Sequence, residues 1–180
     1  FIAVNKDEDI LRNSSSGGVF HEIAEKVLGE SGVVFGAAFD EQQNVEIVAC
    51  GSSEEIKKLY GSKYVQADVQ DTYKDAEKKL KAGKKVLFSG TPCQIGGLYA
   101  YLGKEYDNLI TVDIICHGVP SPKAWEEYKD SVEKKYGARI KKVNFRCKDT
   151  GWRKYSLSFL LEDGRRVKEK VTENLYLRAF

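Results

Sequence analysis

The sequence predicts an α/β fold in which a mixed sheet with parallel β-α units is flanked by helices and followed by an antiparallel C-terminal meander. Two apolar strand-like runs, 85–88 and 109–115, each precede a segment with helical spacing of apolar residues, which is the pattern of a β-α unit. From Ile140 onward, apolar and polar residues alternate instead, as they do in half-buried antiparallel strands. We therefore expect an α/β core over 1–138 and an antiparallel extension over 139–180.

Composition restricts the class of protein. The 180 residues suffice for a single domain, and the net charge of +2 is too balanced to indicate a nucleic-acid or membrane surface. No apolar run reaches the about 20 residues that span a bilayer, and the amino end lacks the layout of a signal peptide. We expect a cytoplasmic protein. Because the chain begins at Phe1 and contains no methionine, we expect a fragment of a longer protein.

The amino-terminal half predicts a helix, a hairpin and two further helices. The helix begins after the serine-rich stretch 13–18, with a serine capping its first turn, and its apolar face is spaced as in an amphipathic helix. A hairpin of strands 32–39 and 45–50 follows, then a short helix from Ser52 through Lys58, and a helix from Asp71 or Thr72 to about Lys81.

The carboxyl-terminal half continues with the β-α units. A helix starting near Gln94 is expected to bury one apolar face, which comprises Ile95, Leu98, Tyr99 and Leu102. The run 109–115 is typical of a strand covered on both faces. Ser121 and Pro122 then begin a helix whose apolar side consists of Trp125, Tyr128, Val132 and Tyr136. Turns at 149–151 and Asp163-Gly164 separate the strands of the meander, and Leu175, Leu177 and Phe180 resume a helical pattern.

The strongest candidate site is the strand-to-helix turn that runs from Gly90 to Gln94. Such a turn directs unpaired backbone N–H groups and the positive end of a helix dipole beyond the carboxyl edge of the sheet. Because the β-α units are parallel, His117, after the next strand, is expected at the same edge. The alternative is a turn that binds nothing, as in many α/β domains.

Two other stretches combine groups that can hold a phosphate. The stretch from Asn13 to Gly18 places three serines and two glycines before a helix. The stretch from Gly61 to Tyr64 brings a glycine, a hydroxyl, a lysine and an aromatic ring together. Each has a structural alternative: an ordinary serine cap for the first, and a strand preceded by a turn for the second.

Cysteine and histidine usage argues against a self-contained metal centre. The four cysteines, at 50, 93, 116 and 147, form no C-x-x-C pair, so free thiols in a reducing compartment are expected. His21 lies on the polar side of its helix and is expected to be exposed to solvent. A thiol-based enzyme that uses Cys93 at a helix start remains an alternative.

Four motifs, taken together and in this order, resemble the beta subunit of coenzyme F-420 hydrogenase/dehydrogenase, and the resemblance extends over essentially the whole chain. They are Asn13-Ser14-Ser15-Ser16-Gly17-Gly18, Gly61-Ser62-Lys63-Tyr64-Val65, Phe88-Ser89-Gly90-Thr91-Pro92-Cys93-Gln94 and Cys116-His117-Gly118-Val119-Pro120-Ser121.

The resemblance implies an oxidoreductase that binds FAD and transfers electrons between iron–sulfur clusters and a two-electron acceptor, which is a deazaflavin coenzyme in methanogen members. It implies a ferredoxin-like domain or subunit as electron donor and allows an oligomer. Carried over by position, the cofactor-binding candidates are Asn13, Ser14, Ser15, Ser16, Gly17, Gly18, Gly61, Ser62, Lys63, Tyr64, Gly90, Thr91, Pro92, Cys93, Gln94 and His117. Cys93 and Cys116 are candidate cluster ligands, an incomplete set because a four-iron cluster takes four thiolates. The alternative is a non-catalytic phosphate- or nucleotide-binding module or scaffold.

Overall fold

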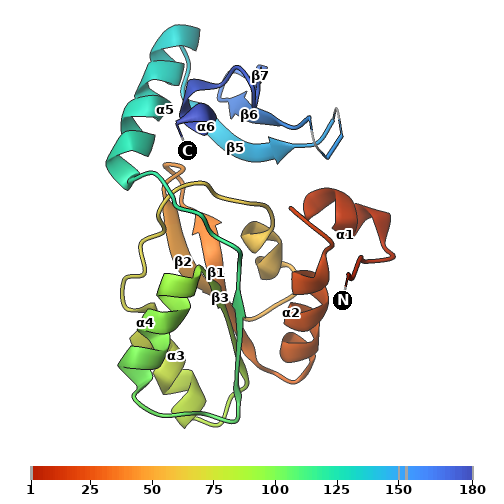
Figure 1. The fold of residues 1–180 in the computed structure, drawn as a ribbon, viewed down its shortest axis with the longest axis vertical. Helices are drawn as coiled ribbons and strands as arrows, with labels where there is room; N and C mark the ends of the chain where they lie inside the picture. Colours follow the sequence, from red (N-terminus) through yellow and green to blue (C-terminus); the bar gives the residue numbers. More distant parts are fainter. Residues whose placement is uncertain (1, 150, 153, 180) are drawn as a thin grey trace. The chain divides into compact units, whose positions relative to one another are not determined.

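The computed structural model describes residues 2–149, 151–152 and 154–179, and the chain divides into two compact units. The first unit comprises Phe1–Ala38, Glu46–Tyr60 and Asp68–His117, and the second comprises Phe39–Val45, Gly61–Ala67 and Gly118–Phe180. Each unit has its own sheet (Figure 1). None of the helices in the described residues combines the length and apolar character needed to cross a membrane.

The sheet of the first unit has four strands in the order β2-β1-β3-β4. Their bounds are β1 Val33–Phe39, β2 Val45–Cys50, β3 Val86–Gly90 and β4 Leu109–Asp113. The pairs β1–β3 and β3–β4 are parallel, with Val33 opposite Val86 and Val86 opposite Leu109. The mixed sheet with parallel β-α units is therefore confirmed.

Helices cover both faces of this sheet. In Figure 1, α2 (Val19–Gly29) lies on one face, and α3 (Thr72–Lys81) and α4 (Pro92–Leu102) lie on the other. Ala24 and Val27 of α2 pack in one apolar cluster with Val34 of β1 and Leu87 of β3. These strands are hydrophobic along their length because helices pack on both of their faces. The remaining helical segments of the first unit are α1 (Glu8–Asn13) and the 3₁₀ helix η1 (Glu55–Leu59).

The prediction that 109–115 forms a strand covered on both faces is wrong. Among the described residues, β4 is an edge strand paired with β3 alone, and its first four residues are only half-buried. The strand ends at Asp113, after which Ile114 is 54% exposed and Ile115 is completely exposed. An apolar run does not distinguish a central strand from an edge strand whose outer surface is left uncovered.

The helix after β3 differs from its prediction in two details. It begins at Pro92 rather than near Gln94, because Thr91 is the N-cap residue and proline suits the first helical position. Tyr99 was expected in the core but is 47% exposed, and its hydroxyl lies 2.8 Å from Thr111 Oγ1. A tyrosine can leave its ring at the surface because its hydroxyl finds a polar partner there.

The second unit contains a three-stranded antiparallel sheet and two helices. The strands are β5 (Ile140–Cys147), β6 (Ser156–Leu161) and β7 (Arg166–Lys170), in that order across the sheet, and the helices are α5 (Pro122–Tyr136) and α6 (Leu175–Arg178). The predicted meander is confirmed, and Val143, Phe145 and Cys147 share the buried face of β5. Thr150 in one predicted turn and Phe180 in the last predicted helix lie outside the described residues.

Trp125 of α5 is at the centre of the second unit and is completely buried. Its ring centroid lies 5.1 Å from that of Phe145 and 5.2 Å from that of Tyr176. Its indole N–H donates a 2.6 Å hydrogen bond to the carbonyl of Gln43, in the turn between β1 and β2. That turn belongs to the second unit and is held further by Lys129, which donates to the Gln42 carbonyl at 2.7 Å.

Candidate functional site at the carboxyl edge of the first sheet

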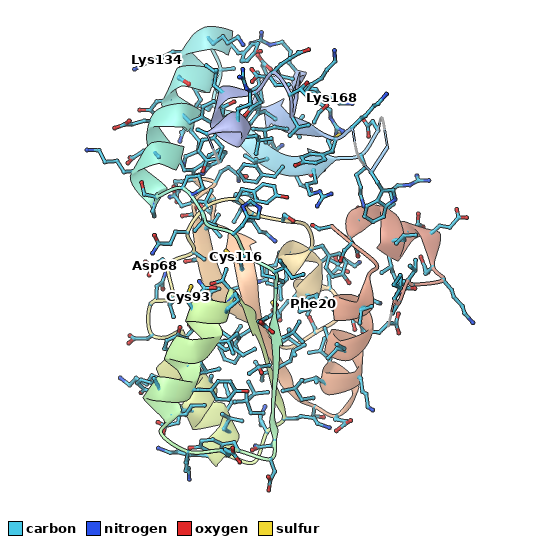
Figure 2. The ribbon with its side chains drawn as sticks, in the orientation of Figure 1. Phe20, Asp68, Cys93, Cys116, Lys134 and Lys168 are labelled. Carbon is cyan, nitrogen blue, oxygen red and sulfur yellow. The ribbon has the colours of Figure 1, made fainter. Side chains whose placement is uncertain are left out.

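The carboxyl ends of β3 and β4 lie side by side, as the parallel β-α pattern predicts. Gly90, the last residue of β3, is opposite Asp113, the last residue of β4. The pairing continues one residue further, because Ile114 N–H donates to the Gly90 carbonyl at 3.0 Å. The turn into α4 and the segment that leads to Cys116 and His117 therefore leave the sheet at one edge. Figure 2 labels Cys93 at the start of α4 and Cys116 after β4.

Hydrogen bonds within the turn reduce the number of donors that it offers to an anion. Thr91 N–H donates to Gln94 Oε1 at 2.9 Å, which is the returning half of a capping box. Pro92 has no N–H. The first backbone N–H of the turn that could reach an anion is therefore that of Cys93, because the Thr91 N–H is already bonded and Pro92 has none. From the sequence, Gln94 was expected to bind a ligand, whereas the structure shows its side chain closing the turn.

Cys93 is exposed, and its thiol lies 3.1 Å from Thr91 Oγ1. Beside it, Tyr73 of α3 donates a 2.7 Å hydrogen bond to the Gln94 carbonyl. Burial, and secondarily the charge of Cys93, raise the pKa of Tyr73. The Tyr73 ring can lie against α4 only because residue 97 is a glycine: a Cβ at Gly97 would be 2.9 Å from the Tyr73 hydroxyl. Sequence reasoning missed this tyrosine, and the only signal was the Gly96-Gly97 pair in an otherwise apolar helix.

The serine–glycine stretch is organised by the chain's own amino-terminal segment. The N-cap of α2 is Gly18, with φ of 77°, so the predicted serine cap is wrong. Ser14 instead donates from its hydroxyl to the Ile10 carbonyl at 2.8 Å. A Cβ at Gly17 would lie 2.2 Å from the Ala3 carbonyl oxygen, so glycine is needed for close backbone packing. Both glycines therefore have structural roles that do not require a phosphate.

The stretch from Gly61 to Tyr64 belongs to the second unit and forms neither helix nor strand. Lys63 Nζ donates to the Gly61 carbonyl at 3.2 Å, and Tyr64 accepts a 2.8 Å bond at its carbonyl from the Tyr176 hydroxyl. Space remains open around Gly61, because a Cβ there would meet no atom within 4 Å. The candidate residues are thus divided between the two units.

The thiols and histidines show one correction. Cys50 and Cys147 are buried and Cys116 is half-buried, and within the described ranges no group of three or more His, Cys, Asp or Glu side chains is arranged to hold a metal ion. His21 was predicted to be exposed to solvent, but it is half-buried and its Nδ1 pairs with the Tyr60 hydroxyl. The residue faces η1 because that short helix packs beside α2, which the spacing within α2 cannot reveal.

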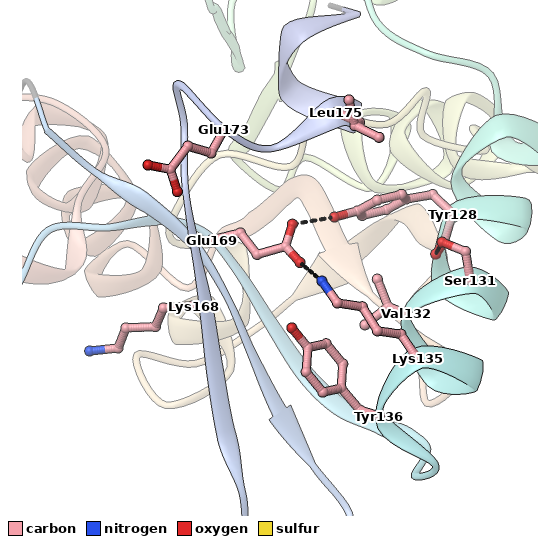
Figure 3. Close-up of a pocket in the computed structure, with 9 residues that line it drawn as sticks. All are labelled: Tyr128, Ser131, Val132, Lys135, Tyr136, Lys168, Glu169, Glu173 and Leu175. Carbon is pink, nitrogen blue, oxygen red and sulfur yellow. Dashed lines mark hydrogen bonds and ion pairs between the residues drawn. The ribbon is translucent and has the colours of Figure 1, made fainter.

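A cavity of about 560 Å³ lies elsewhere, in the second unit between α5, β7 and α6 (Figure 3). None of the predicted site residues lines it. Its Glu169 carboxylate accepts hydrogen bonds from Lys135 at 3.1 Å, Tyr128 at 3.3 Å and Asn174 at 2.7 Å. These bonds occupy the Glu169 carboxylate and join α5 and the start of α6 to β7, so Glu169 and its three partners act as a structural network.

Comparisons with known proteins support the predicted resemblance. The family model for the C terminus of the coenzyme F420 hydrogenase/dehydrogenase beta subunit matches residues 83–178. A chain of the F420-reducing [NiFe] hydrogenase complex from Methanosarcina barkeri, in a xenon-derivatised structure, is similar in fold with a TM-score of 0.61. The two chains are 17% identical over 96% of this chain, which spans 61% of that chain. No curated protein matches. The family match covers more than half of the residues, and the chain therefore belongs to the coenzyme F420 hydrogenase/dehydrogenase beta subunit family, in the region of its C terminus.

Proposed function

We propose that the chain is part of a FAD-dependent oxidoreductase that transfers electrons between iron–sulfur clusters and a two-electron acceptor. Family membership supports an electron-transfer role. The observation that carries the proposal is the edge formed by the ends of β3 and β4, where the start of an 11-residue helix lies next to an exposed apolar segment. We further propose a cytoplasmic location and a ferredoxin-like domain or subunit as the electron donor.

The groups at this edge match the chemistry of a flavin dinucleotide. The start of α4 offers the Cys93 N–H and the helix dipole to a diphosphate. The exposed Ile114 and Ile115 offer apolar surface to a ring. We assign Thr91 and Cys93 to the diphosphate. We do not include the candidates Lys63 and Tyr64 in this assignment, because they belong to the second unit. When bound, FAD supplies hydride chemistry at its N5 atom and one-electron exchange with clusters.

The described residues do not match an iron–sulfur cluster in the same way. Cys93 and Cys116 are two thiols, whereas a four-iron cluster takes four, and the other two cysteines are buried in different units. We therefore place the cluster ligands outside this chain's described residues, and the role that we propose for this chain is to bind the flavin.

The test is a titration of FAD into the full-length protein, purified anaerobically and freed of flavin, followed by flavin fluorescence. Gly90→Val adds branched carbons where a Cβ alone would lie 3.0 Å from Gln94 Oε1. It therefore displaces the Gln94 side chain from its hydrogen bond to the Thr91 N–H and disrupts the turn. We expect at least about tenfold weaker binding, equivalent to about 1.4 kcal/mol. Gly96→Ala is the matched control, because a Cβ there meets no atom within 4 Å, and it should bind as the parent does.

Two results would refute the proposal. One is a parent protein that shows no saturable flavin response. The other is a Gly90→Val variant that keeps its circular dichroism spectrum and the parent's affinity for FAD.

A further inference from the structure

The last strand of the second sheet, β7, has one edge that no other described strand covers. Among the described residues β7 pairs with β6 alone, in an unbroken antiparallel register. At the two ends of this pair, the Arg165 carbonyl and the Val171 N–H bond to the β6 side at 2.9 and 3.3 Å. Residues of an antiparallel strand alternate between bonding to a neighbour and facing away from it. Arg166, Lys168 and Lys170 therefore direct their backbone groups away from β6.

These outward backbone groups are free to bond. Within the described ranges, no residue bonds to the backbone N–H or carbonyl of Arg166 or Lys168, or to the N–H of Lys170. The Lys170 carbonyl accepts hydrogen bonds at 2.9 Å from the N–H groups of Glu173 and Asn174, so the free edge ends there. A strand edge with unpaired N–H and C=O groups is a template for one further extended segment.

The same three residues carry a row of cations on one side of the strand. Arg166, Lys168 and Lys170 are exposed, and Lys168 is directed away from α5 (Figure 3). Arg166 takes part in none of the ion pairs between described residues. Lys168 pairs with Asp149, and the next cation along the strand pairs with Glu173. Both pairs lie at the surface, where ion pairs contribute little to stability, so carboxylates of a bound segment can replace them.

The charge of this row decides what can pair with the edge. Antiparallel pairing with the β7 strand of a second copy would place cations directly opposite cations, which destabilises a sheet. A nucleic acid would meet the cations but has no peptide backbone to match the free N–H and C=O groups. A polypeptide strand with carboxylates at alternate positions satisfies the cations and the backbone together.

The cavity in the second unit accommodates the other side chains of such a strand. It lies between α5, β7 and α6 (Figure 3), and its wall includes Tyr136 and Leu175. Leu175 is 75% exposed. Because successive side chains of a strand point to opposite faces, a strand added to β7 would direct every second side chain toward α5 and this cavity. Apolar side chains at those positions would cover Leu175.

We propose that the free edge of β7 binds a separate polypeptide as an added antiparallel strand in which carboxylate and apolar side chains alternate. The backbone of this strand bonds to Arg166 and Lys168, its carboxylates meet the row of cations, and its apolar side chains enter the cavity. The cations select this strand because they repel a cationic strand and gain no charge pairs from a neutral one. The site uses no residue of the proposed flavin-binding turn, and it does not depend on that function.

The probe is a short fluorescein-labelled peptide of alternating glutamate and valine, titrated with the full-length protein and followed by fluorescence anisotropy. A matched peptide with lysine in place of glutamate tests the charge, and we expect it not to bind. Two further peptides carry N-methyl groups on the glutamates or on the valines. In the proposed pairing only the glutamate N–H groups face β7, so methylation of the glutamates should weaken binding about tenfold or more, and methylation of the valines should not.

Arg166→Glu should weaken binding of the glutamate peptide about fivefold or more, because repulsion replaces a charge pair across the two strands. Lys141→Glu is the matched control: it changes the net charge equally at an exposed position of β5 and should bind as the parent does. Circular dichroism checks that both variants fold.

Four results would overturn the proposal: no saturable binding by the parent, equal binding of the glutamate and lysine peptides, equal effects of the two methylations, or equal affinity in the two variants. Tighter binding of single-stranded oligothymidylate than of the peptide at the same salt concentration would also overturn it, in favour of a nucleic acid.

Discussion

Replacing Trp125 by phenylalanine tests whether the buried indole holds the second unit together. Trp125 is completely buried, and its N–H donates to the Gln43 carbonyl at 2.6 Å. The substitution leaves that carbonyl without its donor, which costs about 1–3 kcal/mol. The smaller ring also leaves a void, for which core truncations indicate about 1–2 kcal/mol more. We expect the free energy of unfolding to fall by about 2–4 kcal/mol.

The assay is chemical denaturation followed by circular dichroism, because the substitution also removes a fluorophore. Trp152→Phe is the matched control: the same chemical change at a side chain that is 42% exposed should alter the free energy of unfolding by about 0.5 kcal/mol or less. The reasoning is refuted if the two variants are equally stable, or if Trp125→Phe loses less than about 0.5 kcal/mol, which is the range of ordinary surface substitutions.

Single contacts give three further predictions. Burial raises the pKa of Tyr128 from 10.0 to about 12, so between these pH values the folded state keeps a proton that the unfolded state releases. The free energy of unfolding should therefore fall as the pH rises from 10 to 12. Tyr128→Phe should flatten this part of the pH–stability curve, and an unchanged slope would contradict the assignment. Gly17→Ala places a Cβ 2.2 Å from the Ala3 carbonyl oxygen and should lower the melting temperature, whereas Gly96→Ala, in open space, should raise stability by about 0.5–1 kcal/mol; the reverse order would argue against the packing of the amino-terminal segment. Cys93 is exposed and should react with iodoacetamide before the two buried cysteines do, which peptide mapping by mass spectrometry can check.

The elements themselves could be predicted with good accuracy from local sequence. Helix α5 begins at Pro122 after the capping Ser121 and ends before Gly137, which has φ of 66°, and each of these positions follows from the chemistry of proline, serine and glycine. The strands β3 and β5 were recognisable because one is continuously apolar and the other alternates. Because these signals depend only on neighbouring residues in the sequence, the corresponding elements form as predicted.

The candidate site was predictable only in part. The adjacency of the Gly90 turn and the segment before His117 followed from parallel β-α topology, and the register of Gly90 with Asp113 bears out the shared edge. The sequence did not indicate that Gln94 Oε1 accepts a hydrogen bond within the turn, or that Gly17 packs against Ala3. Both glycine and glutamine are compatible with ligand binding or with internal packing, and the choice depends on neighbours that the motif does not contain.

By itself, the sequence determined the helices and strands, the parallel order of the β-α units and the family to which the chain belongs, because periodicity, capping residues and ordered motifs are encoded locally. Only the tertiary structure decided that β4 is an edge strand with Ile115 exposed, that His21 pairs with Tyr60, and that Arg146 retains a buried donor without a partner. These features depend on which distant segments pack against each side chain. Burial and hydrogen-bond satisfaction are properties of such neighbours, so no spacing within a single element can specify them.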